Sequence, residues 1–234
     1  MRFVGDISRF YGTGERNKAG QTLDEFLDGY DPRQFDLPSN TTDIIVVRCQ
    51  EELKSWDQQL EVLLIKRGNH PGIGFWATPG GFVEMREHMD DGAARELEEE
   101  TGIQSLPLVQ MATWGDFDRD PRWRVITTSY LALVEGDIPV QAGDDAADAL
   151  WFKVSLEQES NDTENRTEVW NLNLLNEESG IQVGGKIEII HSGHKLLDKK
   201  QYRIVENNCL AADHGCLVTQ ALLYLKEQLE KNWG

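Results

Sequence analysis

The stretch GGFVEMREHMDDGAARELEEETGI, residues 80–103, carries the strongest structural signal in this chain. The segment GFWATPGGFVE (74–84) overlaps the start of this stretch. It combines aromatic residues with Pro and Gly, which predicts a strand that breaks into a tight turn. The following HMDDGAARELEEET (88–101) predicts a helix that ends before Gly102, a plausible C-terminal cap. The stretch therefore predicts a strand, a loop and a helix in succession.

The predicted helix crowds four glutamates into five residues. At a period of 3.6 residues, Glu96, Glu99 and Glu100 stand at i, i+3 and i+4 and share one face, whereas Glu98 points away. Like charges at this spacing repel by roughly 0.2–0.5 kcal/mol per pair. Converging carboxylates that a cation neutralises would explain the crowding, and their hard oxygens suit Mg²⁺ or Mn²⁺. The simpler alternative is that the helix only presents a solvated acidic face.

The spacing around these glutamates extends the pattern in both directions. From Gly81 to Ile103 the residues follow G-x5-E-x7-R-E-U-x-E-E-x-G-U, where U is aliphatic, with a match at every specified position. This motif resembles that of the Nudix hydrolase family. The resemblance implies an α/β (α+β) fold, a Nudix-type α/β/α sandwich with a mixed β-sheet, whose loop and helix bind metal ions that hold a diphosphate.

The resemblance also implies roles for individual residues. Glu99 and Glu100 resemble metal ligands, together with the backbone carbonyl of Gly80. Glu96 resembles either a further ligand or the base that activates water. The expected cofactor is Mg²⁺ or Mn²⁺, because a diphosphate repels hydroxide until cations bind its oxygens and lower the pKa of water.

Four further motif residues have supporting roles under the same resemblance. Arg95 is expected to orient a carboxylate through a charge-assisted pair, and Glu87 is expected to support the loop. Gly81 and Gly102 are expected to serve backbone geometry. Arg95 thus joins the glutamates as a predicted catalytic residue.

The bulk composition limits the partners of the chain. A formal net charge of −18 over 234 residues disfavours nucleic acid, which is bound mainly through basic surfaces. It also disfavours an anionic small molecule unless a cation intervenes. No apolar run of membrane-spanning length and no signal-like N-terminus is present, so we expect a soluble cytoplasmic protein with no membrane partner. The three cysteines have no CxxC spacing and apolar neighbours, which predicts small core residues.

The rest of the chain is expected to form one arm and one domain. Residues 1–41 predict an irregular arm with a short helix at 22–29, and residues 42–234 predict a single Nudix domain with an insertion at 155–206. A β-hairpin-like addition is expected near 160–205, built from 169–175 and 185–191 after a polar loop at 159–168. The remaining predictions are strands at 43–48, 60–67, 124–134 and 149–154, and a closing helix within 209–232.

Two segments bear on the substrate. Residues 113–134 and 142–154 resemble the ADP-ribose pyrophosphatase-like branch of the Nudix family and the related Nudix-type transcriptional regulators of NAD metabolism. Arginines in the first segment could contact phosphate or ribose, and an aromatic residue there could stack on adenine. The candidates are Arg119, Arg122 and Arg124, with Trp114 or Phe117.

Ordinary structure would account for the same residues. Asp116, Asp118 and Asp120 lie beside these arginines, so the segment could be a simple ion-paired loop. Asp144 or Asp145 could supply one more carboxylate near the metal, although an Asp pair before a strand is also usual turn chemistry.

The sequence thus predicts metal-dependent hydrolysis of a nucleoside diphosphate linked to a group X, with ADP-ribose or a similar ADP-sugar or dinucleotide as substrate. The alternatives are a ligand-sensing transcriptional regulator and a non-catalytic nucleotide-binding domain. Regulators with the same segment carry a C-terminal winged helix, whereas few residues follow the predicted closing helix here, so we expect no DNA binding. A homodimer is plausible by analogy with the ADP-ribose branch.

Overall fold

The computed structural model describes residues 3–4, 6–143, 146–194 and 196–233. It divides into two compact units, Met1–Leu37 and Pro38–Gly234. The first unit holds the helix α1 (Leu23–Gly29) and two short 3-10 helices, η1 (Ser8–Phe10) and η2 (Pro32–Gln34). The expected short helix at 22–29 is thus present, and its N-terminus is closed by a capping box between Thr22 and Glu25.

The second unit is built on one mixed sheet. Its described residues form nine strands in the order β4-β5-β1-β2-β6-β7-β8-β9, with β3 beside β2. Strands β1 and β5 run parallel, and the other paired strands in the described part of the chain run antiparallel. The strands are β1 (Ser39–Cys49), β2 (Leu60–Arg67), β3 (Trp76–Ala77), β4 (Val109–Trp114), β5 (Val125–Glu135), β6 (Ala146–Asp162), β7 (Thr167–Asn176), β8 (Ile181–Ser192) and β9 (Lys199–Asn208).

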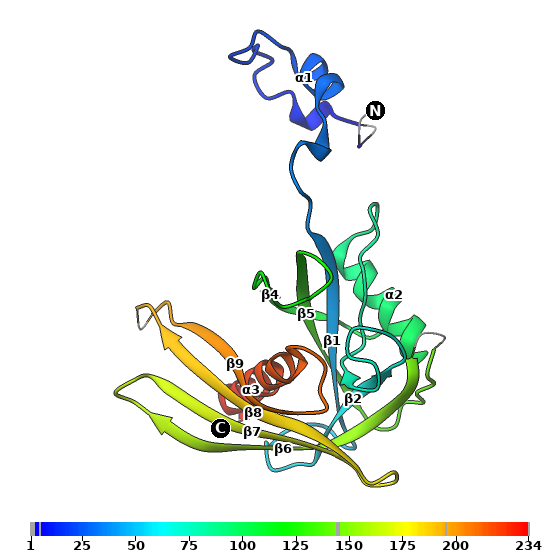
Figure 1. Ribbon diagram of the computed structural model, residues 1–234, viewed down its shortest axis with the longest axis vertical. Helices are drawn as coiled ribbons and strands as arrows, with labels where there is room; N and C mark the ends of the chain where they lie inside the picture. Colours follow the sequence, from blue (N-terminus) through cyan, green and yellow to red (C-terminus); the bar gives the residue numbers. More distant parts are fainter. Residues whose placement is uncertain (1–2, 5, 144–145, 195, 234) are drawn as a thin grey trace. The chain divides into compact units, whose positions relative to one another are not determined.

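Helices cover both faces of this sheet. Helix α2 (Met89–Thr101) and helix α3 (His214–Trp233) lie on opposite sides of β1 (Figure 1). Alternate residues of β1 explain the arrangement, because Ile44 packs in the core with Leu97 of α2 whereas Ile45 packs in the core with α3. The expected α/β/α sandwich with a mixed sheet is confirmed.

The expected hairpin-like addition is larger than predicted. Strand β6 pairs with β2 through Glu61–Lys153 and continues without a break into its pairing with β7, which leads on to β8 and β9. The four strands therefore extend the central sheet beside α3, as Figure 1 shows. Residues 159–162 belong to β6 and residues 167–168 to β7, so only 163–166 of the predicted loop at 159–168 form a turn.

Two strands had no counterpart in the sequence predictions. Strand β4 is an edge strand with half-exposed side chains, and β9 is exposed at almost every position, so neither shows the apolar alternation that marks a strand. Strand β1 starts at Ser39, within the range assigned to the arm, and the division of the chain into an arm and one Nudix domain stays a prediction.

Three smaller features complete the fold. Helix α2 ends at Gly102, which adopts φ 72° and donates its N–H to the Glu98 carbonyl, as the predicted cap requires. Cys49 and Cys216 are buried as expected, but Cys209 is exposed, because it lies in the turn after β9. None of the helices in the described residues combines the length and apolarity needed to cross a membrane.

Candidate active site

The loop after β3 brings the motif residues together. Residues 79–83 run along β1, through hydrogen bonds from the Ile44 N–H to the Pro79 carbonyl (2.8 Å) and from the Thr42 N–H to the Gly81 carbonyl (2.9 Å). Gly80 has φ 151°, and a Cβ on it would collide with the carbonyl of Thr42. Only glycine fits this close approach.

A pocket of about 700 Å³ is lined by this loop, by α2 and β1, and by residues of the segments 67–72, 119–125 and 211–214. Its wall includes the predicted catalytic glutamates, Glu96, Glu99 and Glu100, together with Gly80 and Gly81. The expectation that the three glutamates share one face is therefore met. Glu98 instead accepts a hydrogen bond of 2.6 Å from Gln104, outside the pocket.

Arg95 is the centre of the ion pairs beside the pocket. Its guanidinium donates to both oxygens of Glu87 at 2.8 and 3.1 Å, to Glu96 at 2.8 Å and to Glu99 at 2.9 Å. It also donates to the carbonyl of Phe82 at 3.0 Å, which ties α2 to the loop. The hydrogen bonds from Arg95 to Glu87, together with one from the Glu84 N–H, lower the pKa of Glu87 to about 2.

Glu100 and Glu96 lie against the two loop glycines, Gly80 and Gly81. Glu100 accepts a hydrogen bond of 2.8 Å from the Gly80 N–H, and burial raises the pKa of its carboxyl to about 7. Burial also raises the pKa of Glu96, against the opposing effect of Arg95. The Glu96 carboxylate occupies the space that a Cβ on Gly81 would need, so the glycine lets this side chain approach the loop.

These contacts bear on the predicted metal site. In the described part of the chain, no three His, Cys, Asp or Glu side chains are arranged to hold a metal ion. Arg95 donates hydrogen bonds to Glu96 and Glu99, and the Gly80 N–H donates one to Glu100. The role of the Gly80 carbonyl as a metal ligand stays a prediction. The donor set nevertheless fits a hard cation, because three carboxylates line one pocket wall.

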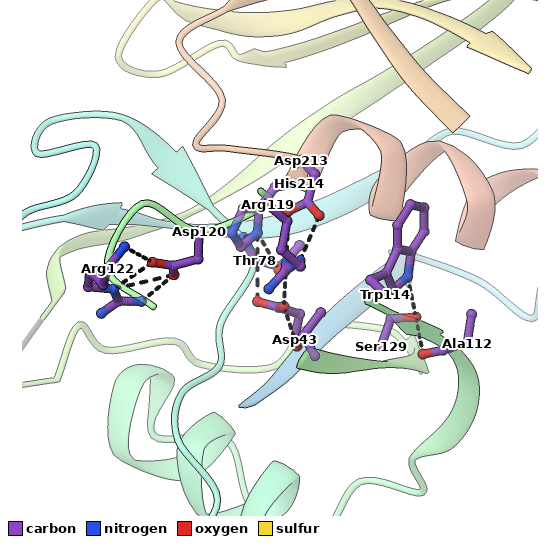
Figure 2. A network of polar contacts seen from close by, with 11 residues as sticks. Asp43, Thr78, Ala112, Trp114, Arg119, Asp120, Arg122, Ser129, Asp213 and His214 are labelled. Atoms are coloured by element: carbon purple, nitrogen blue, oxygen red, sulfur yellow. Dashed lines mark hydrogen bonds and ion pairs between the residues drawn. The ribbon is translucent and has the colours of Figure 1, made fainter. Parts of the chain in front are cut away.

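A second polar cluster on the pocket wall joins elements far apart in the chain (Figure 2). Arg119 donates to both oxygens of Asp213 at 2.9 Å, and its Nη2 lies 3.8 Å from Asp43. Nδ1 of His214 accepts the Thr78 N–H at 3.2 Å and lies 2.8 Å from the Thr78 hydroxyl.

The predicted substrate residues are split by the fold. Arg119 and Arg122 line the pocket, and Arg122 pairs with Asp120 at 2.7 Å. Trp114 does not line it, because its Nε1 donates to Ser129, as Figure 2 shows. Its ring packs against Tyr202 of β9. Phe117 is 81% exposed and also lies outside the pocket wall.

Two other predictions concern the acidic and basic residues nearby. Arg124 donates to the carbonyl of Asp116 at 3.0 Å and does not line the pocket. Asp144 and Asp145 lie outside the described residues. The suggestion that they supply a carboxylate near the metal therefore stays a prediction.

Several pocket residues were missed by the sequence predictions. They include Asp43, Arg67, Phe82 and His214. Phe82 lies inside the Nudix-like motif but at a position that the pattern leaves free, and Asp213 and His214 lie within the range 209–232 predicted to hold the closing helix. An aspartate beside a histidine in that range was a further signal for the second cluster, in addition to Arg119.

The comparison with protein families decides the assignment. The family model described as NUDIX domain matches residues 41–169, which include the glutamates, Arg95 and both loop glycines. This chain belongs to the NUDIX family. The predicted resemblance to Nudix hydrolases and to their ADP-ribose pyrophosphatase-like branch is confirmed.

Individual NUDIX proteins resemble parts of the chain. An ADP-ribose pyrophosphatase of Methanocaldococcus jannaschii is 41% identical over 97 residues, which is 41% of this chain and 56% of that protein. An ADPR responsive transcriptional repressor, NtrR, of Acinetobacter baylyi is 37% identical over 111 residues, which is 47% of this chain and 42% of that protein. The chain thus spans only about half the length of these curated relatives.

Solved NUDIX structures agree with the fold. A MutT/nudix family protein from Enterococcus faecalis aligns with a TM-score of 0.64 at 27% identity, over 97% of this chain and 76% of that one. The NUDIX domain of Shewanella oneidensis NrtR, complexed with ADP ribose, aligns with a TM-score of 0.57 at 25% identity, over 88% of this chain and 99% of that one.

Proposed function

We propose that this chain is a metal-dependent Nudix pyrophosphohydrolase. Its substrate would be a nucleoside diphosphate linked to a group X, with ADP-ribose or a similar ADP-sugar or dinucleotide preferred. The observation that carries this proposal is the pocket wall on which Glu96, Glu99 and Glu100 face Gly80 and Gly81. The similarity to a protein named ADP-ribose pyrophosphatase supports the substrate class.

The chain's own residues would divide the work of hydrolysis. Glu96, Glu99 and Glu100 would hold Mg²⁺ or Mn²⁺ with the Gly80 carbonyl, and Glu96 would serve either as a ligand or as the base that takes a proton from water. When bound, the cation supplies charge neutralisation of the diphosphate and acidifies water. Arg95, held by Glu87, would fix the position of the glutamates relative to the loop. Its guanidinium contacts both Glu96 and the Phe82 carbonyl.

The second candidate function is that of an ADP-ribose-responsive regulator. It is favoured by the 37% identity to a repressor and by the likeness to an NrtR NUDIX domain that holds ADP ribose. The net charge of −18 disfavours a DNA-binding surface on this chain. A nucleotide-binding domain without turnover is the third alternative.

One set of assays separates these functions. Phosphate release is measured after coupled digestion of the products, with Mg²⁺ or with chelator, across ADP-ribose, NADH, diadenosine polyphosphates, nucleotide sugars and oxidised nucleoside triphosphates. We expect Mg²⁺-dependent turnover, highest for ADP-ribose or a similar ADP compound. A gel-shift assay with genomic fragments at low salt is expected to show no retardation. Retardation without turnover would favour the regulator, and nucleotide binding without either would favour the non-catalytic domain.

A further inference from the structure

Phe82 combines a rigid backbone with an exposed ring. Its segment is held on both sides, since the Val83 N–H donates to the Asn40 carbonyl and Arg95 donates to the Phe82 carbonyl, each at 3.0 Å. The side chain is nevertheless 46% exposed and lies on the pocket wall. An aromatic ring that gains little from burial in the fold is available to a ligand.

Arg122 lies over this ring. Its guanidinium carbon is 5.2 Å from the centroid of Phe82, and both residues line the pocket. Asp120 fixes the guanidinium through contacts of 3.0 and 3.3 Å to Nε and 2.7 Å to Nη2, and it also accepts the Arg122 backbone N–H at 2.8 Å (Figure 2). The planar group is therefore pre-oriented, and its charge is already paired.

A paired arginine is a poor phosphate receptor but a good stacking surface. The guanidinium of Arg122 has a carboxylate partner and covers one face of the Phe82 ring, while the Arg122 side chain stays 44% exposed on the pocket wall. Aromatic rings and guanidinium planes both stack on flat heterocycles. Phe82 also directly follows Gly81, which faces Glu96, so the pair borders the place proposed for the diphosphate.

We propose that Phe82 and Arg122 form the platform on which the nucleobase of the substrate stacks. This inference rests on the proposed function and deepens it, because it assigns the base to the Phe82 end of the pocket. It replaces Trp114 and Phe117, which do not line the pocket, as the adenine-stacking residues. Stacking selects by flat area more than by hydrogen-bonding edge, so purines should bind more tightly than pyrimidines, with little discrimination between adenine and guanine.

Binding of uncleaved product-like ligands tests the platform. Calorimetric titrations of the full chain with Mg²⁺ compare AMP, GMP and UMP with ribose 5-phosphate, which has the same phosphate and no base. We expect AMP and GMP to bind about tenfold more tightly than ribose 5-phosphate, with UMP between them. Because the phosphate and the cation contribute to the binding of all four ligands, the ratio of each nucleotide's affinity to that of ribose 5-phosphate measures the contribution of the base.

Variants of the two residues sharpen this test. Phe82→Leu keeps an apolar side chain but removes the ring, so it should abolish most of the AMP advantage, and Phe82→Trp should restore it. Arg122→Lys keeps the positive charge but loses the planar guanidinium, so it should also reduce the affinity of AMP relative to ribose 5-phosphate. The matched control is Phe75→Leu, since Phe75 is 40% exposed outside the pocket wall and the ratio should not change.

The outcomes distinguish this inference from the proposed hydrolase function. An AMP advantage that survives in both Phe82→Leu and Arg122→Lys would overturn the platform, as would a wild-type chain that binds AMP no more tightly than ribose 5-phosphate. If Phe82→Leu fails to fold, Arg122→Lys alone decides. Base-dependent binding that responds to these variants, without hydrolysis of any substrate, would refute the hydrolase and leave the platform standing.

Discussion

The carboxylate of Glu100 accepts the backbone N–H of Gly80 at 2.8 Å, which ties the last turn of α2 to the loop after β3. The two residues are twenty positions apart in the chain, and their contact closes one wall of the pocket.

Neutralising the glutamates should remove activity and spare the fold. Glu99→Gln and Glu100→Gln should each lower the hydrolysis rate by at least ~10²-fold, since each removes one charge from the proposed cation site. In Glu100→Gln the amide oxygen can still accept the Gly80 N–H, so the thermal unfolding temperature should change little. Glu98→Gln is the matched control, because Glu98 lies on α2 outside the pocket wall. Full activity in both pocket variants would refute the assignment of the metal site.

The two loop glycines should respond differently to alanine. At Gly80 a Cβ meets the backbone of Thr42 at a φ of 151°, so Gly80→Ala should destabilise the protein by at least about 1 kcal/mol. At Gly81 the obstacle is the end of the flexible Glu96 side chain, which can swing away. Gly81→Ala should therefore lower the hydrolysis rate with a smaller loss of stability. Urea unfolding and steady-state rates measure both, and equal stability losses would contradict this distinction.

Glu87 should make stability depend on pH in the acid range. Its pKa is lowered from 4.5 to about 2, mainly by hydrogen bonds from Arg95. A carboxyl with a depressed folded-state pKa contributes stability that is present above the unfolded pKa and is lost as pH falls through the folded pKa. Glu87→Gln should therefore be less stable than wild type at about pH 6, and this difference should shrink between about pH 4.5 and pH 2. Urea unfolding midpoints of both proteins across that pH range measure the difference in stability. A difference that does not change with pH would refute a stabilising Arg95–Glu87 ion pair.

The cysteines should differ in reactivity. Burial raises the pKa of the Cys216 thiol to about 12, Cys49 is also buried, and Cys209 is exposed. The thiolate is the reactive form, so a maleimide at about pH 8 should label native protein at Cys209 alone and all three cysteines in urea. Peptide mass mapping identifies the labelled site. Rapid labelling of Cys216 in native protein would show that α3 opens from the sheet.

Local spacing was enough to predict much of this fold and the acidic side of its pocket. The common face of Glu96, Glu99 and Glu100 follows from the helical period, and the cap at Gly102 follows from the end of the same pattern. Strands β1, β2 and β5 were predictable because their buried apolar runs are continuous. Edge strands β4 and β9 were not predictable, because their side chains are largely exposed and therefore show no alternation of apolar and polar residues.

Tertiary structure alone decided which distant residues share the pocket. Arg119 meets Asp213 across 94 positions of sequence, and Phe82 meets Arg122 only because the loop after β3 and the loop before β5 both lie against the pocket. The same geometry places Trp114 beside α3, although it is a near neighbour of Arg119 in the chain. Helical and strand periods specify which side of an element a residue occupies. Which elements become neighbours depends on the pairing and packing of the whole sheet, and no local pattern records that choice.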